Sequence, residues 1–326
     1  MKLIVQMPAL NEAKSIAGVI AAVPRAIPGV DSVDVVVVDD GSTDETAALA
    51  RSLGSTVLSH DRRRGVGAAF RTGIEHAMAC DADLVVTIDS DGQFNPADIP
   101  TLIAPVLRGE ADFVSASRFM DPSLMPEMTR TKTWGNHFMS RWVSRLVNRR
   151  FYDVSCGFRA YSREAYLRLV LLGDFTYTHE VFLNLAFAGV RMAEVPIRVR
   201  GIREHGQSRV AGNLFRYGWR TSAIILRAYR DYKPMQFFGS MAGTCAVVAV
   251  ALGAFLLSVK IRTGGFTPHK WAGFASASFA FLSLLLLFIG MVAEMMDRAR
   301  VARHEMLYRI RRIERTLASP RSSSSS

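Results

Sequence analysis

The sequence predicts an α/β protein, in which a doubly wound, mostly parallel sheet is followed by an interfacial helix and two transmembrane helices. Short apolar runs alternate with helix-like segments through the first half of the chain, and two long uncharged runs follow in the second half. Alternating strands and helices build parallel sheets with helices on both faces. A chain of 326 residues with 49% hydrophobic content can form one sizeable core and a membrane segment.

Apolar runs predict strands at residues 3–7, 33–38, 56–58, 84–88 and 113–116, with a last strand pattern that ends near Val199. Helical periodicity predicts helices at residues 14–23, 44–53, 66–78 and 97–107. Ser42 and Glu45 fit a capping box that opens the second of these helices. Because ligands of doubly wound sheets bind beyond the carboxyl ends of the strands, the polar residues after each strand are the candidate site.

Three polar clusters, at residues 8–12, 39–42 and 89–93, follow three of these strands. The third contains Asp89, Asp91 and Gln93 at alternating positions, where the side chains of an extended chain point the same way. Oxygen ligands of this kind suit a hard cation such as Mg²⁺ or Mn²⁺. A simple Asp-Gly turn is the alternative. The three clusters together predict one site with a divalent cation.

Two runs, residues 237–259 and 271–293, contain no Asp, Glu, Lys, Arg or His. At about 1.5 Å per residue, each covers a hydrocarbon core of about 30 Å. The short link contains Gly264, Gly265 and Pro268, which indicates a hairpin with both ends on one side. Lys and Arg are more numerous in the flanks than in the link, so we expect a multi-pass protein of the inner (plasma) membrane whose large domain and both termini are cytoplasmic. Two helices buried in a soluble core are the alternative.

The net charge of +11 is concentrated before the hairpin. Residues 198–233 combine many arginines with aromatic and aliphatic residues, a composition that suits a helix in contact with anionic membrane lipid. Nucleic acid is not an expected partner, since no nucleic-acid-binding motif is present. We expect a catalytic domain at 1–210, an amphipathic interfacial helix at 211–233, the hairpin at 234–294 and a basic helical tail with a disordered end at 295–326. The tail is expected to pack on a neighbouring subunit of a homo-oligomer or on anionic lipid.

The polar clusters belong to a series of motifs: Met-Pro-Ala-Leu-Asn-Glu at 7–12, Asp-Asp-Gly-Ser-Thr-Asp at 39–44, Asp-Ser-Asp-Gly-Gln at 89–93, Ser-Arg-Phe at 117–119 and Ser-Cys-Gly-Phe-Arg at 155–159. In this order, residues 1–210 resemble family 2 glycosyltransferases of the GT-A fold, in the branch of dolichyl-phosphate mannose synthases and bacterial polyisoprenyl-phosphate glycosyltransferases. The chain departs from that pattern at Cys156, where Ser or Thr is usual, and at Arg209, where Lys is usual.

The resemblance implies a role for each matching residue. The residues implied to bind the nucleotide are Pro8, Ala9, Asn11, Glu12, Val38, Asp40, Asp89 and Ser90. The implied metal ligands are Asp89, Asp91 and Gln93, the implied phosphate-binding residues are Arg118, Arg130, Arg203 and Arg209, and the implied catalytic residues are Asp91, Arg118, Asp153 and Arg203. Helix capping is an alternative for Asn11 and Glu12, and a turn or a cap for Asp40. Histidines such as His60 and His137 are expected to have structural roles.

The implied reaction is a metal-dependent, inverting transfer of a sugar from a nucleotide diphosphate sugar to a polyisoprenyl phosphate at the cytoplasmic membrane face. A phosphomonoester is mostly a dianion at pH 7 and attacks without a general base. The protein must therefore hold two mutually repelling phosphate groups together, and Asp153 would orient the site or act as a base. A membrane-anchored nucleotide-binding scaffold, and a family 2 transferase with a different lipid or glycan acceptor, remain alternatives.

Overall fold

The computed structural model describes residues 1–126, 128–170, 178–200, 226–227 and 229–318. Contacts divide the chain into two compact units. The first, which we call the sheet unit, contains Met1–Gly212 and Leu307–Ser326, and the second, the hairpin unit, contains Asn213–Met306. Each unit is described by itself below.

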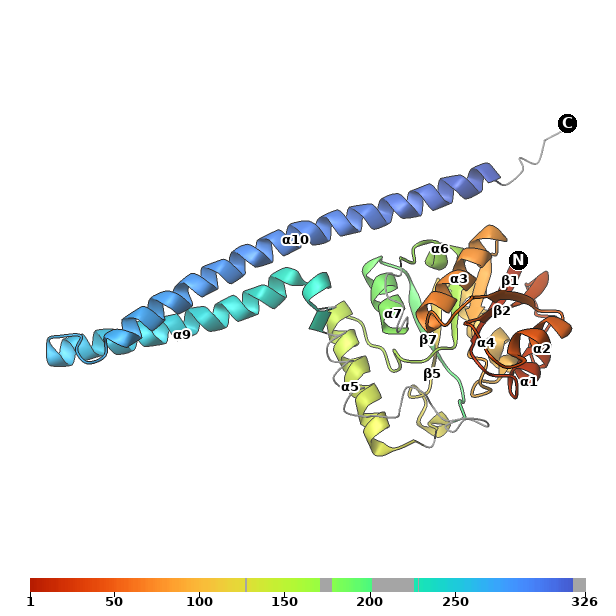
Figure 1. The fold of residues 1–326 in the computed structure, drawn as a ribbon, viewed down its shortest axis with the longest axis horizontal. Coiled ribbons are helices and arrows are strands. Elements are labelled where there is room, and N and C mark those ends of the chain that lie inside the picture. Colours follow the sequence, from red (N-terminus) through yellow and green to blue (C-terminus); the bar gives the residue numbers. More distant parts are fainter. Residues whose placement is uncertain (127, 171–177, 201–225, 228, 319–326) are drawn as a thin grey trace. The chain divides into compact units, whose positions relative to one another are not determined.

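Within the described residues of the sheet unit, one seven-stranded sheet has the strand order β3-β2-β1-β4-β6-β5-β7 (Figure 1). The strands are β1 (Lys2–Ala9), β2 (Ser32–Asp39), β3 (Thr56–Ser59), β4 (Leu84–Thr87), β5 (Phe113–Ser117), β6 (Arg159–Ser162) and β7 (Met192–Pro196). Strand β6 runs antiparallel to both neighbours and all other pairs are parallel. The predicted doubly wound, mostly parallel sheet is confirmed, whereas the antiparallel β6 was not predicted.

The helices predicted between the strands are present. The sheet unit contains α1 (Ile16–Ala21), α2 (Thr46–Ser52), α3 (Val66–Ala79), α4 (Ile99–Leu107), α5 (Arg130–Val147), α6 (Arg163–Leu167) and α7 (Thr178–Phe187). The predicted capping box of α2 is wrong. Asp44 Oδ1 accepts the Thr46 N–H at 3.1 Å, while Ser42 Oγ accepts a hydrogen bond from the Asn11 N–H at 2.9 Å. The Ser42 hydroxyl joins two loops and does not cap its own helix.

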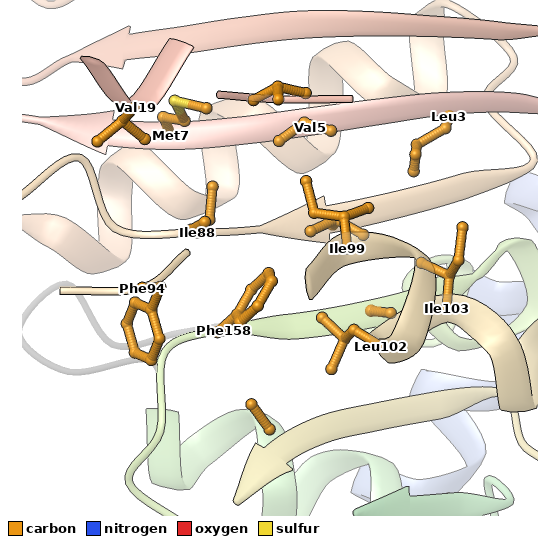
Figure 2. Packing of buried hydrophobic residues seen from close by; sticks show 14 of the residues in the cluster. Leu3, Val5, Met7, Val19, Ile88, Phe94, Ile99, Leu102, Ile103 and Phe158 are labelled. Carbon is orange, nitrogen blue, oxygen red and sulfur yellow. The ribbon is translucent and has the colours of Figure 1, made fainter. Parts of the chain in front are cut away.

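The core follows from the alternation of side chains along β1. Figure 2 shows residues from one face of the sheet packed against α1 and α4. The labelled residues are Leu3, Val5, Met7, Val19, Ile88, Phe94, Ile99, Leu102, Ile103 and Phe158. Each fully buried aliphatic or aromatic side chain contributes about 1.5–3 kcal/mol. Helix α3 lies on the opposite face, so close to β1 that a Cβ on Gly73 would lie 1.8 Å from Gln6 Oε1.

The hairpin unit contains α9 (Pro234–Thr263) and the part of α10 (Lys270–Ala318) that ends at Met306, and the two helices run side by side (Figure 1). Ser276 Oγ donates to the Ala249 carbonyl at 2.8 Å, and Ser283 Oγ donates to the Ala242 carbonyl at 2.9 Å. Both helices are long and apolar enough to cross a membrane, and both predicted runs lie within them. Only 11% of each apolar window is buried, unlike the buried helices of a soluble core.

The C-terminal end of α10 belongs to the sheet unit, where it contacts α6. Tyr308 Oη donates to Glu164 Oε2 at 2.7 Å, and Arg311 donates to the carbonyls of Leu167 and Leu169 at 2.9 and 2.7 Å. Carbonyls at the end of a helix lack partners within it, so Arg311 satisfies the last carbonyl of α6, at Leu167, together with the Leu169 carbonyl just beyond the helix. The sequence predicted a neighbouring subunit or anionic lipid as the partner of the tail, and this stays a prediction. Within the described residues, Tyr308 and Arg311 of the tail contact the sheet unit of the same chain.

Candidate functional site

The loops after β1, β2 and β4 meet at one edge of the sheet. Strand β1 lies between β2 and β4, and all three are parallel, so their carboxyl ends are neighbours. The Ser90 hydroxyl donates to the Pro8 carbonyl at 2.9 Å, and the Asp40 N–H donates to the Ala9 carbonyl at 2.9 Å. The three polar clusters that the sequence placed at strand ends therefore form one continuous surface.

The loop after β1 is joined to the loop after β2 through Asn11. Its N–H donates to Ser42 Oγ at 2.9 Å, and its Oδ1 accepts the Thr43 N–H at 2.8 Å. Asn11 adopts a left-handed φ of 52°, which asparagine tolerates better than most residues. Glu12 donates its N–H to Thr46 Oγ1 at 2.9 Å. The N-cap residue of α1 is Ser15, whose hydroxyl lies 3.2 Å from Glu12 Oε2. The exposed Asn11 side chain holds the two loops in register.

Asp40 is buried and fixes the loop between β3 and α3. Its Oδ1 accepts the Arg64 N–H at 2.8 Å and contacts His60 Nδ1 at 2.9 Å, and its Oδ2 accepts the Gly65 N–H at 2.8 Å. His60 Nε2 lies 3.0 Å from Thr72 Oγ1 on α3. An ionised carboxylate offers about four acceptor positions, so about one remains at Asp40. The neighbouring Val38 is fully buried.

The candidate metal ligands follow β4. Asp91 is 3% exposed, and its Oδ1 accepts the Gln93 N–H at 3.0 Å across a turn in which Gly92 has a φ of 75°. The Gln93 side chain donates to the Arg200 carbonyl at 3.2 Å. Opposite them, a Cβ built on Gly157 would lie 2.9 Å from Asp89 Oδ2. The absent side chain at Gly157 leaves the space in which the Asp89 carboxylate lies.

This set of donors fits a magnesium or manganese ion bound together with a phosphorylated ligand. Among the described residues, no group of three or more His, Cys, Asp or Glu side chains could hold a metal. Mg²⁺ is usually bound by one or two carboxylates, with waters and substrate phosphates as the remaining ligands. Asp89 and Asp91 would supply the carboxylates of such a site, and Gln93 would supply an amide oxygen.

Arg118 and Asp153 form a buried ion pair at the end of β5. Arg118 Nε and Nη2 donate to the two carboxylate oxygens at 2.6 and 2.9 Å, and Nη2 also donates to Ser155 Oγ at 2.6 Å. Burial alone would raise the pKa of the fully buried Asp153, but the charge and hydrogen bonds of Arg118 hold that pKa below its ordinary value. On β7, burial raises the pKa of Glu194, which accepts the Tyr152 and Asp153 N–H groups.

Arg159 is a structural residue that sequence reasoning missed. It is fully buried and donates to the carbonyls of Cys156, Val154 and Thr178 at 2.7, 3.0 and 2.8 Å. It therefore shapes the backbone that carries Asp153. The available signal was its place in the Ser-Cys-Gly-Phe-Arg motif at 155–159, within which it was given no role. Burial also raises the pKa of the Cys156 thiol to about 12, so this departure from the family motif provides no thiolate.

The remaining predicted site residues differ in their burial, and two of them are not described by the structure. Ala9 and Ser90 are buried and Pro8 and Glu12 are half-buried at the carboxyl edge. Arg130 is exposed at the first position of α5. Arg203 and Arg209 lie outside the described residues. The structure thus brings together the predicted nucleotide and metal residues and, separately, the Arg118–Asp153 pair.

Comparisons with known proteins agree with this architecture. Residues 4–170 match the model of glycosyl transferase family 2. The chain is 32% identical over 205 residues to the dolichyl-phosphate hexose transferase of Haloferax volcanii, covering 61% of this chain and 82% of that protein. It is 27% identical over 300 residues to the undecaprenyl-phosphate 4-deoxy-4-formamido-L-arabinose transferase of Edwardsiella ictaluri, covering 88% of this chain and 83% of that protein.

Among solved structures, the chain is similar to glucosyl-3-phosphoglycerate synthase from Mycobacterium tuberculosis in complex with Mn²⁺, UDP-glucose and phosphoglyceric acid. The TM-score is 0.55 at 25% identity, over 70% of this chain and 79% of that one. The likeness covers the GT-A fold, with its mostly parallel sheet. The family match, the relatives and the fold agree, and this chain therefore belongs to glycosyl transferase family 2 and is a glycosyltransferase.

Proposed function

We propose that this protein transfers a sugar, with inversion, from a nucleotide diphosphate sugar to a polyisoprenyl phosphate at the cytoplasmic membrane face, in a reaction that depends on Mg²⁺ or Mn²⁺. The observation that carries this proposal is the carboxyl edge of the sheet, where Asp89 and Asp91 adjoin the loops of Asn11 and Asp40. Two relatives whose names specify polyprenyl phosphate acceptors support the acceptor class.

The donor nucleotide would occupy the carboxyl edge. Asp40 keeps about one acceptor position for an N–H of the base or a hydroxyl of the ribose. Asp89, Asp91 and Gln93 would hold the divalent cation, which when bound neutralises the departing nucleoside diphosphate. The residues Pro8, Ala9 and Ser90 form the adjoining floor. Asn11 and Glu12 support the donor site by holding two loops together.

Arg118 would bind phosphate at this site, with Asp153 as its orienting partner. The fully buried Asp153 accepts two hydrogen bonds from the Arg118 guanidinium and one from the Arg118 N–H, a geometry that favours orientation over proton abstraction. No general base is required, because the acceptor phosphate is mostly a dianion at pH 7. A single in-line displacement by that dianion inverts the anomeric carbon. Arg203 and Arg209 follow shortly after Arg200, which is hydrogen-bonded to Gln93, and would bind the acceptor phosphate there.

Membrane attachment would bring the lipid acceptor to the enzyme. The hairpin unit provides two helices of membrane length, and the greater number of basic residues outside its link favours a cytoplasmic catalytic domain. Helix α5 adds an exposed aromatic pair: Trp134 and Phe138 are 68% and 45% exposed, and their rings stack with centroids 5.4 Å apart. Tryptophan is enriched at membrane interfaces because one part of its ring system is apolar and the other polar.

The test is transfer of labelled sugar from a panel of UDP and GDP sugars to polyprenyl phosphate in vesicles. We expect label in the lipid fraction, loss of transfer with a chelator, recovery with Mg²⁺ or Mn²⁺, and an inverted anomeric configuration. Asp91→Asn should remove transfer. Asp34→Asn is the matched control, because Asp34 lies near the other end of β2 in a surface pair with Lys2.

The outcomes separate the alternatives. Nucleotide binding without transfer to any acceptor would favour a scaffold, and transfer of label to a glycan would favour a different acceptor. Retention of the donor's anomeric configuration would reject the single displacement.

A further inference from the structure

Helix α5 carries a row of polar side chains that faces the segment around Asp153. Asn136, Ser140 and Ser144 are four residues apart in turn, so they lie on one side of the helix. The Ser155 hydroxyl lies 3.1 Å from Asn136 Oδ1, Ser140 Oγ accepts the Val154 N–H at 3.3 Å, and Ser144 Oγ accepts the Phe151 N–H at 2.9 Å. Each member of the row therefore contacts the same short segment, residues 151–155.

The segment 151–155 is also held from β7. Glu194 accepts the N–H groups of Tyr152 and Asp153, each at 2.8 Å. The backbone of the segment is thus fixed between β7 and α5, and its side chains at Asp153 and Ser155 hold the Arg118 guanidinium. The position of Arg118 depends on the segment and not on β5 alone.

Asn136 differs from the two serines of the row because it contacts a side chain that touches Arg118. Ser140 and Ser144 accept hydrogen bonds only from backbone N–H groups of the segment. Ser155 Oγ accepts from Arg118 Nη2 at 2.6 Å and has a single proton, which faces Asn136 Oδ1 at 3.1 Å and Asp153 Oδ1 at 3.0 Å. The proton can be donated to only one of these two acceptors at a time. When it is donated to Asn136 Oδ1, a lone pair of Ser155 Oγ stays directed toward Arg118.

We propose that Asn136 is a positioning residue, which sets the orientation of the Arg118 guanidinium through Ser155. This inference rests on the proposed function, in which Arg118 binds phosphate of the nucleotide sugar. Helix α5 supports the same region at a second point, since the His137 ring packs on the Phe119 ring with centroids 4.9 Å apart, directly beside Arg118. Phosphate recognition by arginine depends on the direction of its planar donors, so loss of the Asn136 contact alters recognition while the ion pair persists.

The experiment is a double-mutant cycle with Asn136→Ala, Ser155→Ala and the double variant, in the full-length protein. Donor kcat/KM and the affinity for UDP or GDP with Mn²⁺ are measured. We expect each single variant to lose about tenfold, because a misplacement of about 1 Å can cost about 100-fold and the shift expected here is smaller. The double variant should lose no more than Ser155→Ala alone, since both changes interrupt one chain of contacts. Acceptor KM and the unfolding temperature should stay unchanged.

Thr133→Ala is the matched control on the same helix. The Thr133 hydroxyl donates to the Thr129 carbonyl at 3.3 Å, and within the described part of the chain it has no hydrogen bond to segment 151–155. Equal losses in Thr133→Ala, losses that add in the double variant, or full activity and affinity in Asn136→Ala would each overturn the proposal. Arg118→Lys distinguishes failure of the positioning role from failure of the proposed function. If Arg118→Lys is fully active, the assignment of Arg118 as a phosphate-binding residue is wrong. If Arg118→Lys is defective and Asn136→Ala is normal, the positioning role of Asn136 alone is rejected.

Discussion

Gly157→Ala is expected to weaken the divalent-cation site while the protein remains folded. A Cβ at this position would lie 2.9 Å from Asp89 Oδ2, 3.2 Å from Oδ1 and 3.3 Å from Cγ. Contacts under 3.0 Å are essentially never seen for a Cβ, so the carboxylate must move, by about half an ångström for ordinary carbon–oxygen contact. Gly157 does not have a left-handed φ, so alanine can adopt its backbone conformation and the change acts on Asp89.

The size of the effect follows from the demands of the cation. Mg²⁺ requires near-ideal octahedral geometry, with oxygen ligands at about 2.0–2.1 Å. Changes in residues that orient metal ligands typically cost about 10–100-fold in metal affinity or activity. This range corresponds to about 1.4–2.7 kcal/mol. We therefore expect the Mg²⁺ concentration needed for half-maximal transfer to rise at least about tenfold.

Two measurements test this prediction: Mn²⁺ binding in the presence of UDP or GDP, followed by electron paramagnetic resonance, and transfer as a function of Mg²⁺ concentration. Gly18→Ala is the matched control, because Gly18 is exposed on α1 and a Cβ there would meet nothing within 4 Å. Unchanged metal affinity and normal transfer in Gly157→Ala would refute the assignment of Asp89 as a metal ligand. Loss of the folded state in Gly157→Ala would refute the claim that the change is local.

Three further predictions concern single groups. Asp91→Asn should abolish transfer with little loss of folding, whereas Gln93→Ala should reduce transfer less because water can replace a neutral ligand. Near-normal, chelator-sensitive turnover in Asp91→Asn would contradict the assignment of Asp91 as a metal ligand. Arg203→Ala or Arg209→Ala should slow transfer to a short, soluble polyprenyl phosphate at least about tenfold, since a hydrogen bond to a charged group contributes about 1.5–3 kcal/mol. Arg216→Ala should have a smaller effect. Equal small losses in all three variants would indicate a basic surface without a specific phosphate site. Because the pKa of Asp153 is lowered in the folded state, its stabilising contribution should be present above its unfolded pKa of about 3.9 and be lost as the pH falls through the lower folded value. Unfolding of the full-length protein in detergent, followed from pH 7 to acid, should show this loss in the parent and not in Asp153→Asn.

Regular patterns made the central part of the sheet predictable. The apolar runs at 3–7 and 33–38 correspond to β1 and β2, and the periodic segment at 66–78 corresponds to α3. Their signals are local, since strand and helix periods can be read from consecutive residues. The same holds for the two uncharged runs, whose length alone indicated helices α9 and α10. Because the carboxyl ends of parallel strands share an edge, the predicted nucleotide and metal residues were placed together before any contact was known.

Hydrogen-bonded partners that are distant in the sequence could not be predicted. The Ser42 hydroxyl contacts Asn11 and not its own helix, and the pattern of a capping box carries no information about a competing loop. Asp40 matched a nucleotide position, yet most of its acceptor positions are used by His60 and the backbone of 64–65. Such choices depend on which N–H groups the fold brings within about 3 Å.

Sequence by itself determined the class of the molecule, the order of its elements and the residue types at the carboxyl edge, because those properties depend on local periodicity and on motifs. Tertiary structure alone decided which groups are paired. It joined Arg118 to Asp153, placed Asn136 of α5 against Ser155 and set Gly157 against Asp89. The physical reason is that a buried polar group requires a partner, and its partner is selected by the packing of whole helices and strands.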